Sequence, residues 1–309
     1  MKKHLLTAIL LLATTIGNAQ LYEQNGIRYS IISPNSVMTE ASWDTGITDY
    51  DIPEAIELDG KEYYVTRIGA NLTSVSSESV RIPKTITQID DRAFIRTESL
   101  TKVYIDDVAA WVGINFVGND NNPLSGKKHS NLSVYVDGEK TRNIVLPETI
   151  GHISAKAFYR CYWLSSIQLP ASLTIIHENS FYRCLGLKSI TLPENINTIG
   201  DYAFSECEGL DSVIVKFNTP IELDGGHQFD DGTFIRATLY VPLGCKTAFQ
   251  NAPVWSKFAK IEELADNTSV HSLRAAALAA GRAYTLNGTE AADHTRGFVI
   301  QDGKKAVRK

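Results

Sequence analysis

Apolar and polar positions in the central part of the chain follow an order that repeats every 23 residues. The repeat is clearest at phenylalanine, which recurs as Phe158, Phe181 and Phe204. A constant period of about 20–29 residues is typical of solenoid proteins, in which each unit buries its apolar side chains only against its neighbours. The pattern therefore predicts one elongated solenoid, with equivalent side chains stacked in a single interior.

Each unit also contains short stretches that read as strands. Ile190 and Leu192 flank a polar residue, as expected for a strand with one buried face. Pro193 follows directly, and it ends the strand because it cannot donate a backbone hydrogen bond. A second short strand is expected around Ile199. The predicted fold class is a β-rich solenoid with short parallel strands in each coil, capped at both ends.

The period is interrupted once. Phe94 belongs to an earlier, degenerate copy, and the distance from Phe94 to Phe158 is 64 residues, which exceeds one period by 41 residues. The excess predicts an enlarged coil near residues 106–143, containing a strand that ends at the Asp137-Gly138 turn.

The two ends of the solenoid differ in composition from its centre. The Asp59-Gly60 turn is typical of a hairpin and predicts antiparallel strands before the first coil. Near the other end, a helix-like stretch with Phe249, Trp255 and Phe258 is suited to closing the core. The predicted organisation after residue 19 is a β-rich N-terminal cap over 20–65, a solenoid over 66–264 with its C-terminal cap at 237–264, a linker over 265–283 and a short β-like tail over 284–309.

The first residues are typical of a secretory signal peptide. Lys2 and Lys3 precede an almost unbroken apolar run from Leu5 to Ile16, and small residues follow up to Ala19. The apolar run is too short to span a bilayer. Residues 1–19 are therefore predicted to be removed near Ala19, so that the mature protein is secreted or carried to the cell surface and has no membrane span.

The charge of the mature chain argues against nucleic acid as a partner. Without Lys2 and Lys3 the chain has 28 basic and 35 acidic residues, a formal net charge of −7. Such a surface repels phosphate backbones, and the chain has no compensating cluster of lysine and arginine.

Three of the four cysteines occupy one repeat position: Cys161, Cys184 and Cys207. A free cysteine packs as a small apolar residue, so the three side chains are expected to stack inside the solenoid. A disulfide between adjacent coils is the alternative, since neighbouring strands lie about 4.8 Å apart and the protein is expected to be exported. The paired C-x-x-C spacing of a zinc site is absent. The predicted core residues are Phe94, Phe158, Phe181, Phe204, Cys161, Cys184 and Cys207.

Motifs for catalysis, metals or cofactors are missing from the sequence. His152 and His177 fall on neighbouring coils but not in an H-E-x-x-H context, and there is no G-x-S-x-G motif or glycine-rich phosphate loop. Two loops, 119–122 and 224–232, are rich in Asn and Asp but lack the spacing of a calcium loop. The sequence predicts a protein that is not an enzyme and that needs no cofactor and no metal.

Aromatic and arginine side chains gather beside the repeated phenylalanines. Tyr, Trp and Arg are the residue types that most often anchor protein interfaces. Some of these side chains would instead pack along the side of the solenoid, which is the structural alternative. The predicted partner-binding residues are Tyr159, Arg160, Tyr162, Trp163, Tyr182 and Arg183.

The repeat resembles that of the BspA-type leucine-rich repeat proteins of bacterial cell surfaces. The family pattern, L-x-x-I-x-[IL]-P-x-x-[IV]-x-x-I-G-x-x-A-F-x-x-C, is matched nearly position for position by residues 187–207. The segment 106–143 resembles the enlarged repeat of the family, with its D-x-A-A-W and N-P-L elements at 107–111 and 122–124. The stretch 239–258 resembles the terminal module of the family, and the tail over 284–309 resembles the C-terminal sorting segments of secreted Bacteroidota proteins.

The resemblance implies two parallel strands per coil and a role in binding host matrix proteins, other bacteria or receptors, without catalysis. We therefore expect a non-catalytic protein- or glycan-binding adhesion module, whose partner is an extracellular molecule, from the host or from another source. A structural component of the cell envelope, with no specific external ligand, is the alternative.

Overall fold

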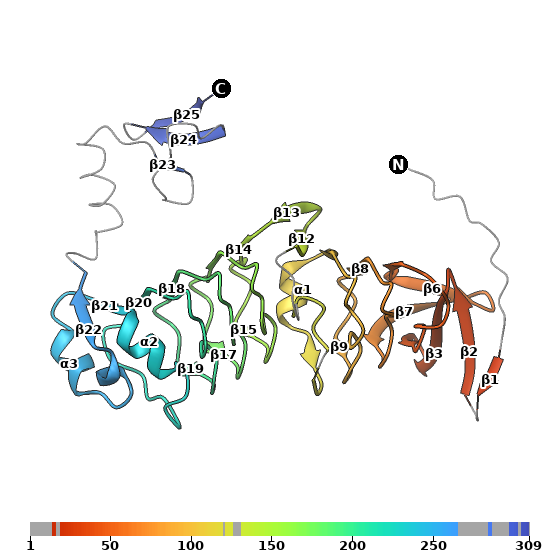
Figure 1. Ribbon diagram of the computed structural model, residues 1–309, viewed down its shortest axis with the longest axis horizontal. Helices are drawn as coiled ribbons and strands as arrows, with labels where there is room; N and C mark the ends of the chain where they lie inside the picture. Colours follow the sequence, from red (N-terminus) through yellow and green to blue (C-terminus); the bar gives the residue numbers. More distant parts are fainter. Residues whose placement is uncertain are drawn as a thin grey trace.

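The computed structural model describes residues 14–16, 19–119, 121–125, 131–264, 284–285, 297–301 and 304–308. Figure 1 shows an elongated molecule, with antiparallel strands near the N-terminus and short helices at the far end of the solenoid. The predicted signal peptide and linker lie almost entirely outside the described residues. Among the described residues, no helix is both long and apolar enough to cross a membrane.

The N-terminal part is a set of hairpins that leads into the solenoid. The expected hairpin at Asp59-Gly60 is confirmed: Asp59 has φ 51° and Gly60 has φ 79°, a left-handed pair that favours glycine at the second position. The strands of this part are β1 (Thr14–Ile16), β2 (Ala19–Gln24), β3 (Ile27–Ser33), β4 (Ser36–Glu40), β6 (Ala55–Leu58) and β7 (Lys61–Ile68).

Parallel pairing begins earlier than the sequence predicted. Residues 20–65 were expected to be antiparallel, yet β4 pairs in parallel with β7, and β5 (Asp49–Asp51) pairs in parallel with β8 (Ser79–Ile82). Val37 and Val65 lie in register and are both fully buried, which gives β4 the same inward face as a solenoid strand. The predicted cap thus contains the first rungs of the solenoid.

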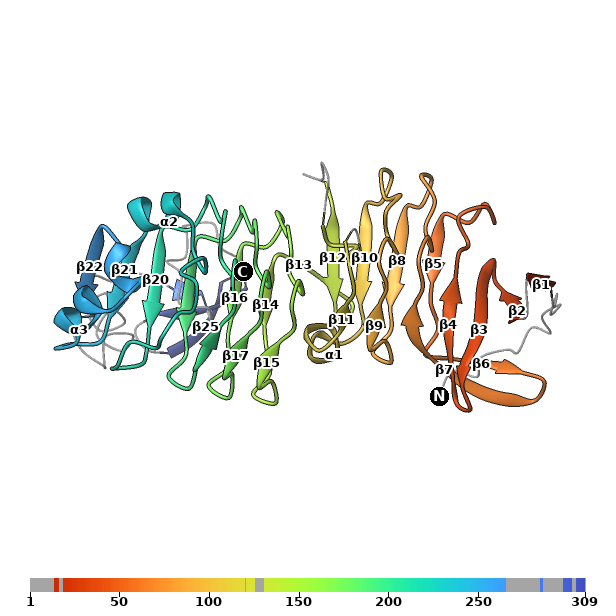
Figure 2. The same cartoon turned by 90° about the horizontal axis from the view of Figure 1, so that it is seen from below.

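The predicted short parallel strands are confirmed, and they form two rows along the molecule. The broad row comprises β5, β8, β10 (Lys102–Ile105), β12 (Ser133–Val136), β14 (Asn143–Val145), β16 (Ser166–Gln168), β18 (Ser189–Leu192), β20 (Ser212–Val215), β21 (Thr238–Val241) and β22 (Lys260–Glu263). The narrow row comprises β7, β9 (Gln88–Ile89), β11 (Asn115–Phe116), β15 (His152–Ile153), β17 (Ile175–Ile176) and β19 (Thr198–Ile199). Figures 1 and 2 show the two rows from two directions.

Short helices occupy the irregular coils: α1 (Val108–Val112), α2 (Asp231–Arg236), α3 (Lys246–Asn251) and the 3-10 turn η1 (Trp255–Lys257). The helix-like stretch expected before Phe258 is therefore two short pieces. Helix α2 begins inside a segment that was predicted to be a loop. The carboxylate of Asp230 caps this helix by accepting a hydrogen bond from Thr233 N at 3.0 Å.

Stacked phenylalanine rings fill the interior of the regular coils. The ring centroids of Phe158 and Phe181 are 5.3 Å apart, and those of Phe181 and Phe204 are 5.2 Å apart, with interplanar angles of 8° and 3°. Phe229 continues the stack at 5.5 Å from Phe204. Phe94 is also buried, in the N-terminal half of the solenoid.

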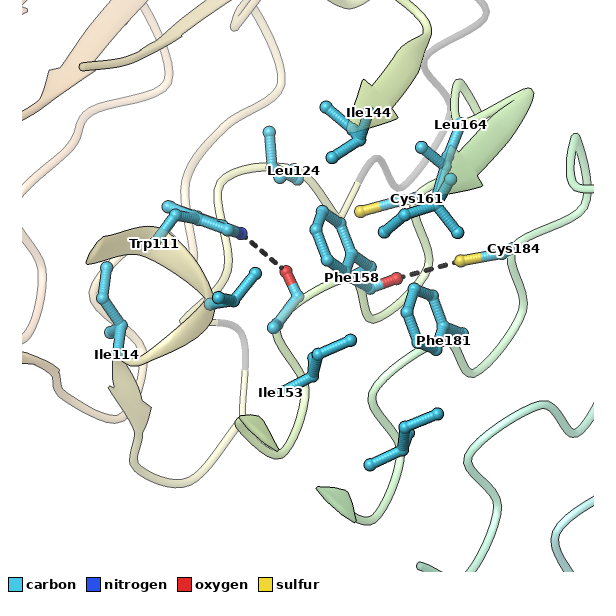
Figure 3. Packing of buried hydrophobic residues seen from close by; sticks show 14 of the residues in the cluster. Trp111, Ile114, Leu124, Ile144, Ile153, Phe158, Cys161, Leu164, Phe181 and Cys184 are labelled. Atoms are coloured by element: carbon cyan, nitrogen blue, oxygen red, sulfur yellow. Dashed lines mark hydrogen bonds between the residues drawn. The ribbon is translucent and has the colours of Figure 1, made fainter. Parts of the chain in front are cut away.

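The three repeated cysteines are buried free thiols, and two of them donate to the preceding coil. Cys184 Sγ donates to Phe158 O, and Cys207 Sγ donates to Phe181 O, both at 3.1 Å. Figure 3 shows the first of these bonds beside the stacked rings. Burial raises the pKa of Cys161 and Cys184, and it raises the pKa of Cys207 to about 12. These thiols therefore stay protonated near neutral pH.

We expect Ellman's reagent at pH 8 to react quickly with one thiol of the four in the folded protein, because Cys245 alone among the cysteines is partly exposed. All four should react in guanidinium without reductant. A Cys245→Ser variant serves as the control and should show no fast phase. Fewer than four thiols in guanidinium would instead support the disulfide alternative, and fast reaction of a second thiol would contradict the burial.

An enlarged coil joins the two halves of the solenoid. Among the described residues, β13 (Glu139–Thr141) pairs antiparallel with β12 and covers its outer edge, and β11 does not pair with β15. We call the contact between residues 108–125 and residues 154–160 the junction. Its backbone link is the bond from Ser154 N to Val112 O at 2.8 Å, which places α1 where a preceding narrow-row strand would lie.

Side chains replace missing backbone donors at the junction. In a regular coil, Ser180 O and Tyr182 O accept hydrogen bonds from Phe158 N and Arg160 N of the coil before. Ala157 O and Tyr159 O occupy the equivalent positions in the first regular coil. Trp111 Nε1 donates to Ala157 O at 3.0 Å, as Figure 3 shows. Asn122 Nδ2 donates to the same oxygen at 3.1 Å, and Ser125 Oγ donates to Tyr159 O at 2.6 Å. The enlarged coil thus satisfies carbonyl groups that would otherwise be buried without partners.

Candidate partner-binding surface

The predicted surface lies on the third side of the coils, between the narrow row and the broad row. Two residues per coil, four positions apart, have positive φ on this side: Lys156 and Arg160, Asn179 and Arg183, Tyr202 and Glu206. Phe158 N and Arg160 N, on alternate residues, donate to the next coil at 2.8 and 2.7 Å. Because each coil is fixed to the next by such bonds, side chains at one repeat position are held above one another.

Four of the predicted binding residues form a continuous group, which we call the flank: Tyr159, Arg160, Tyr182 and Arg183. The rings of Tyr159 and Tyr182 stack with centroids 5.2 Å apart and an interplanar angle of 14°. The Arg160 guanidinium lies 5.9 Å from the centroid of the Tyr159 ring. All four side chains are half-buried, so each presents part of its surface to solvent.

Glu206 in the third regular coil orders one end of the flank. Its carboxylate accepts a hydrogen bond from the Tyr182 hydroxyl and lies 3.1 Å from Arg183 Nε. Burial, followed by this hydrogen bond, raises the pKa of Tyr182 to about 12. Glu206 is not among the binding residues predicted from the sequence. The repeat could have indicated it, since Glu206 follows Arg160 and Arg183 at the same position, where its charge is opposite.

The structure corrects the prediction for Trp163. This residue is only 4% exposed and belongs to the core, so its indole is not an exposed anchor. Later coils have Gly186 and Gly209 at this repeat position. A Cβ on Gly186 would lie 2.6 Å from Leu164 O, because the preceding regular coil packs against it. The first regular coil faces the enlarged coil instead, which leaves room for a large ring. Tyr162, the remaining predicted residue, is half-buried.

A cleft of about 440 Å³ lies at the N-terminal end of the flank. One wall comes from the enlarged coil and the other from the first two regular coils. The lining residues are Gly118, Asn119, Asn121, Ser125, Lys156, Tyr159, Arg160, Glu178 and Asn179. This cleft was not predicted from the sequence.

A second aromatic group lies on the broad row, and we call it the sheet stripe: Asp51, Arg81, Tyr104 and Tyr135. These residues are in register on neighbouring strands. The rings of Tyr104 and Tyr135 stack at 4.6 Å, the Arg81 guanidinium lies 5.6 Å from the Tyr104 ring, and Arg81 Nε lies 3.0 Å from the Asp51 carboxylate. Each stripe residue stands between two apolar residues along the chain, a signal that is visible in the sequence.

The histidines and the loops rich in Asn and Asp have other surroundings. The rings of His152 and His177 meet edge to face at 5.9 Å. Asn121 and Asn122 use their amide groups as donors to backbone carbonyls, and Asp230 caps α2. Throughout the described ranges, no group of three or more His, Cys, Asp or Glu residues is placed to hold a metal ion. Asp120 lies outside those ranges.

The sequence matches a known protein family. Residues 62–117 and 133–230 match, in six copies, the family model described as the BspA type leucine rich repeat region. No curated protein matches the chain.

Several solved structures are similar to the chain. One is a leucine rich cell surface protein from Faecalibacterium prausnitzii, which is 20% identical over 78% of this chain and 76% of that chain, with a TM-score of 0.45. A leucine rich repeat protein from T. pallidum is 17% identical, with coverages of 78% and 81% and a TM-score of 0.35. A leucine-rich repeat protein from Bacteroides ovatus is 14% identical, with coverages of 78% and 89% and a TM-score of 0.21.

Proposed function

Because the chain belongs to the BspA-type leucine-rich repeat family, we propose that it is an exported, non-catalytic module that binds a protein or a glycan at the bacterial surface. A repeat fold is a scaffold, so its function depends on the residues that the scaffold presents. The proposal depends on one observation above all, the flank of stacked Tyr159 and Tyr182 with Arg160 and Arg183 beside them.

The flank has the chemistry and the rigidity of a binding surface. Tyrosine and arginine are enriched among the residues that dominate binding energies. Glu206 holds Tyr182 and Arg183, and the stacked rings restrict each other. Side chains that are ordered before binding lose less conformational entropy when the partner arrives.

The proposal is tested with the chain from residue 20 to 309 on arrays of glycans and extracellular matrix proteins. We expect a Tyr159→Ala/Tyr182→Ala double variant to bind its partner about tenfold more weakly or worse. The matched control is Tyr104→Ala/Tyr135→Ala in the sheet stripe, which also removes two stacked, partly exposed tyrosine rings and should bind as the wild type does. Melting temperatures of all three proteins exclude loss of the fold.

If only the sheet-stripe variant loses binding, the binding site lies on the broad row and the assignment to the flank is wrong. If the wild type binds nothing on the arrays but stays at the cell envelope, the structural alternative replaces the binding function.

Export is the second part of the proposal. In the tail, β24 (Gly297–Gln301) pairs antiparallel with β23 (Tyr284–Thr285) and β25 (Lys304–Arg308). We expect deletion of residues 284–309 in a Bacteroidota host to remove the protein from the outer surface, as measured by protease accessibility on intact cells. The purified variant should keep its melting temperature, because residues 20–264 hold the solenoid core. Unchanged surface exposure would contradict the sorting role of the tail.

A further inference from the structure

The cleft at the junction has walls that are fixed before any ligand binds. Asn121 is 2% exposed, and its amide donates to Val117 O at 2.7 Å. Asn119 N donates to the Asp91 carboxylate at 2.7 Å, while Asn119 O accepts from Arg92 N at 2.8 Å. Ser125 is tied to the opposite wall through Tyr159 O. A preformed polar cleft of about 440 Å³ is within the range of small-ligand sites.

Arg160 in the cleft lacks the ion pair that its equivalent in the next coil makes. Arg183 in the second regular coil lies 3.1 Å from the Glu206 carboxylate. Arg160 has the same repeat position in the first regular coil, but among the described residues it makes no ion pair. Its Nε, like that of Arg183, is buried without a hydrogen-bond partner. Lys156 donates to Gly118 O, a neutral acceptor. A guanidinium in this condition favours an incoming carboxylate, which it can bind through two parallel hydrogen bonds.

The other lining groups fit a sugar ring. Tyr159 offers an aromatic surface, and Asn119, Ser125 and Asn179 add amide and hydroxyl groups around it. Small-ligand sites commonly combine an aromatic wall with a few polar groups that fix orientation. A pyranose has both an apolar C–H face and a rim of hydroxyl groups, so it matches this lining better than a purely apolar ligand would.

We propose that the junction cleft binds a carboxylated sugar, with Arg160 and Lys156 holding the carboxylate and Tyr159 packing against the ring. The proposal rests on the proposed binding function and names the ligand class for one end of the same surface. Glu178, which also lines the cleft, carries the opposite charge and is exposed to solvent.

The test uses isothermal titration calorimetry on the chain from residue 20 to 309. The acidic probes are the methyl glycosides of N-acetylneuraminic acid and glucuronic acid, which also distinguish a sialic acid from a uronic acid. The matched neutral probes are their methyl esters. We expect at least one acid to bind and its ester to bind about tenfold more weakly or worse, because esterification removes the charge.

Three variants locate the site. Arg160→Gln should weaken binding of the acid about tenfold or more, Arg160→Lys should weaken it less, and Glu178→Gln should leave it unchanged or tighter. Melting temperatures within a few degrees of the wild type show that each variant is folded. Equal binding of acid and ester, unchanged binding in Arg160→Gln, or loss of binding in Glu178→Gln would each overturn the proposal.

The experiments distinguish a wrong proposal for the cleft from a wrong proposal for the binding function of the flank. Tyr182 belongs to the flank but does not line the cleft. If Tyr182→Ala abolishes binding to an array partner while neither acid binds the wild type, the flank keeps its function and the carboxylated-sugar site is wrong.

Discussion

A Phe181→Ala variant is expected to lower the free energy of unfolding by about 3–5 kcal/mol, the usual cost of truncating a buried phenylalanine. The Phe181 ring is fully buried between Phe158 and Phe204 and stacks with both. Its removal leaves a cavity in the middle of the stack, and it also takes away two ring contacts, each worth about 0.5–1.5 kcal/mol beyond burial.

Urea denaturation followed by circular dichroism measures this change. Ser189→Ala, on an exposed strand position of the following broad-row strand, is the control and should lie within about 0.5 kcal/mol of the wild type. A loss of less than about 1 kcal/mol for Phe181→Ala would mean that the rings do not share one packed interior.

The second large effect is expected at the junction, where a Trp111→Ala variant should cost about 3–5 kcal/mol. Trp111 is 1% exposed, packs against Phe116 at 5.3 Å and donates to Ala157 O. Trp111 is thus a central contact between the enlarged coil and the first regular coil. Repeat units are stabilised by their neighbours. When the Trp111 side chain is removed, the two halves of the solenoid should therefore unfold in two separate transitions.

A Trp111→Phe variant separates packing from hydrogen bonding at the same position. It keeps an aromatic ring in the core, although a smaller one, and loses the indole donor, while Asn122 still donates to Ala157 O. A loss of about 1 kcal/mol and a single transition are expected. If Trp111→Ala unfolded in one transition with the stability of Trp111→Phe, the junction would not depend on the packing of this side chain.

The regular coils could be predicted from sequence because each repeats the same local rules. Phe158, Phe181 and Phe204 are spaced by one period, so their stacking follows once the coils are known to superimpose. Phe229 was missed because it follows Phe204 by 25 residues, in an irregular coil whose longer path still brings its ring onto the stack. Two rings stack when the fold brings them to the same place in successive coils. The repeat period predicts which rings these are only where the coils have equal lengths.

The binding surface could be predicted only in part. Tyr159 and Tyr182 share a repeat position, so their proximity could be inferred from sequence. The burial of Trp163 and the existence of the cleft depend on where the enlarged coil packs against the first regular coil. That coil has no internal period, and its contacts with Ala157 and Tyr159 come from side chains instead of a repeated backbone pattern.

The central claim is that one continuous interior, joined at the junction, holds the flank rigid. Native-state hydrogen exchange tests this claim most directly, because amides that exchange only when the whole structure unfolds report the free energy of global unfolding. We predict that Ser154 N–H, which crosses the junction to Val112 O, exchanges with the same free energy as Phe181 N–H, which bonds to Ala203 O within the regular coils. Exchange of Ser154 that is faster by orders of magnitude would show that the two halves separate freely, and would contradict the claim.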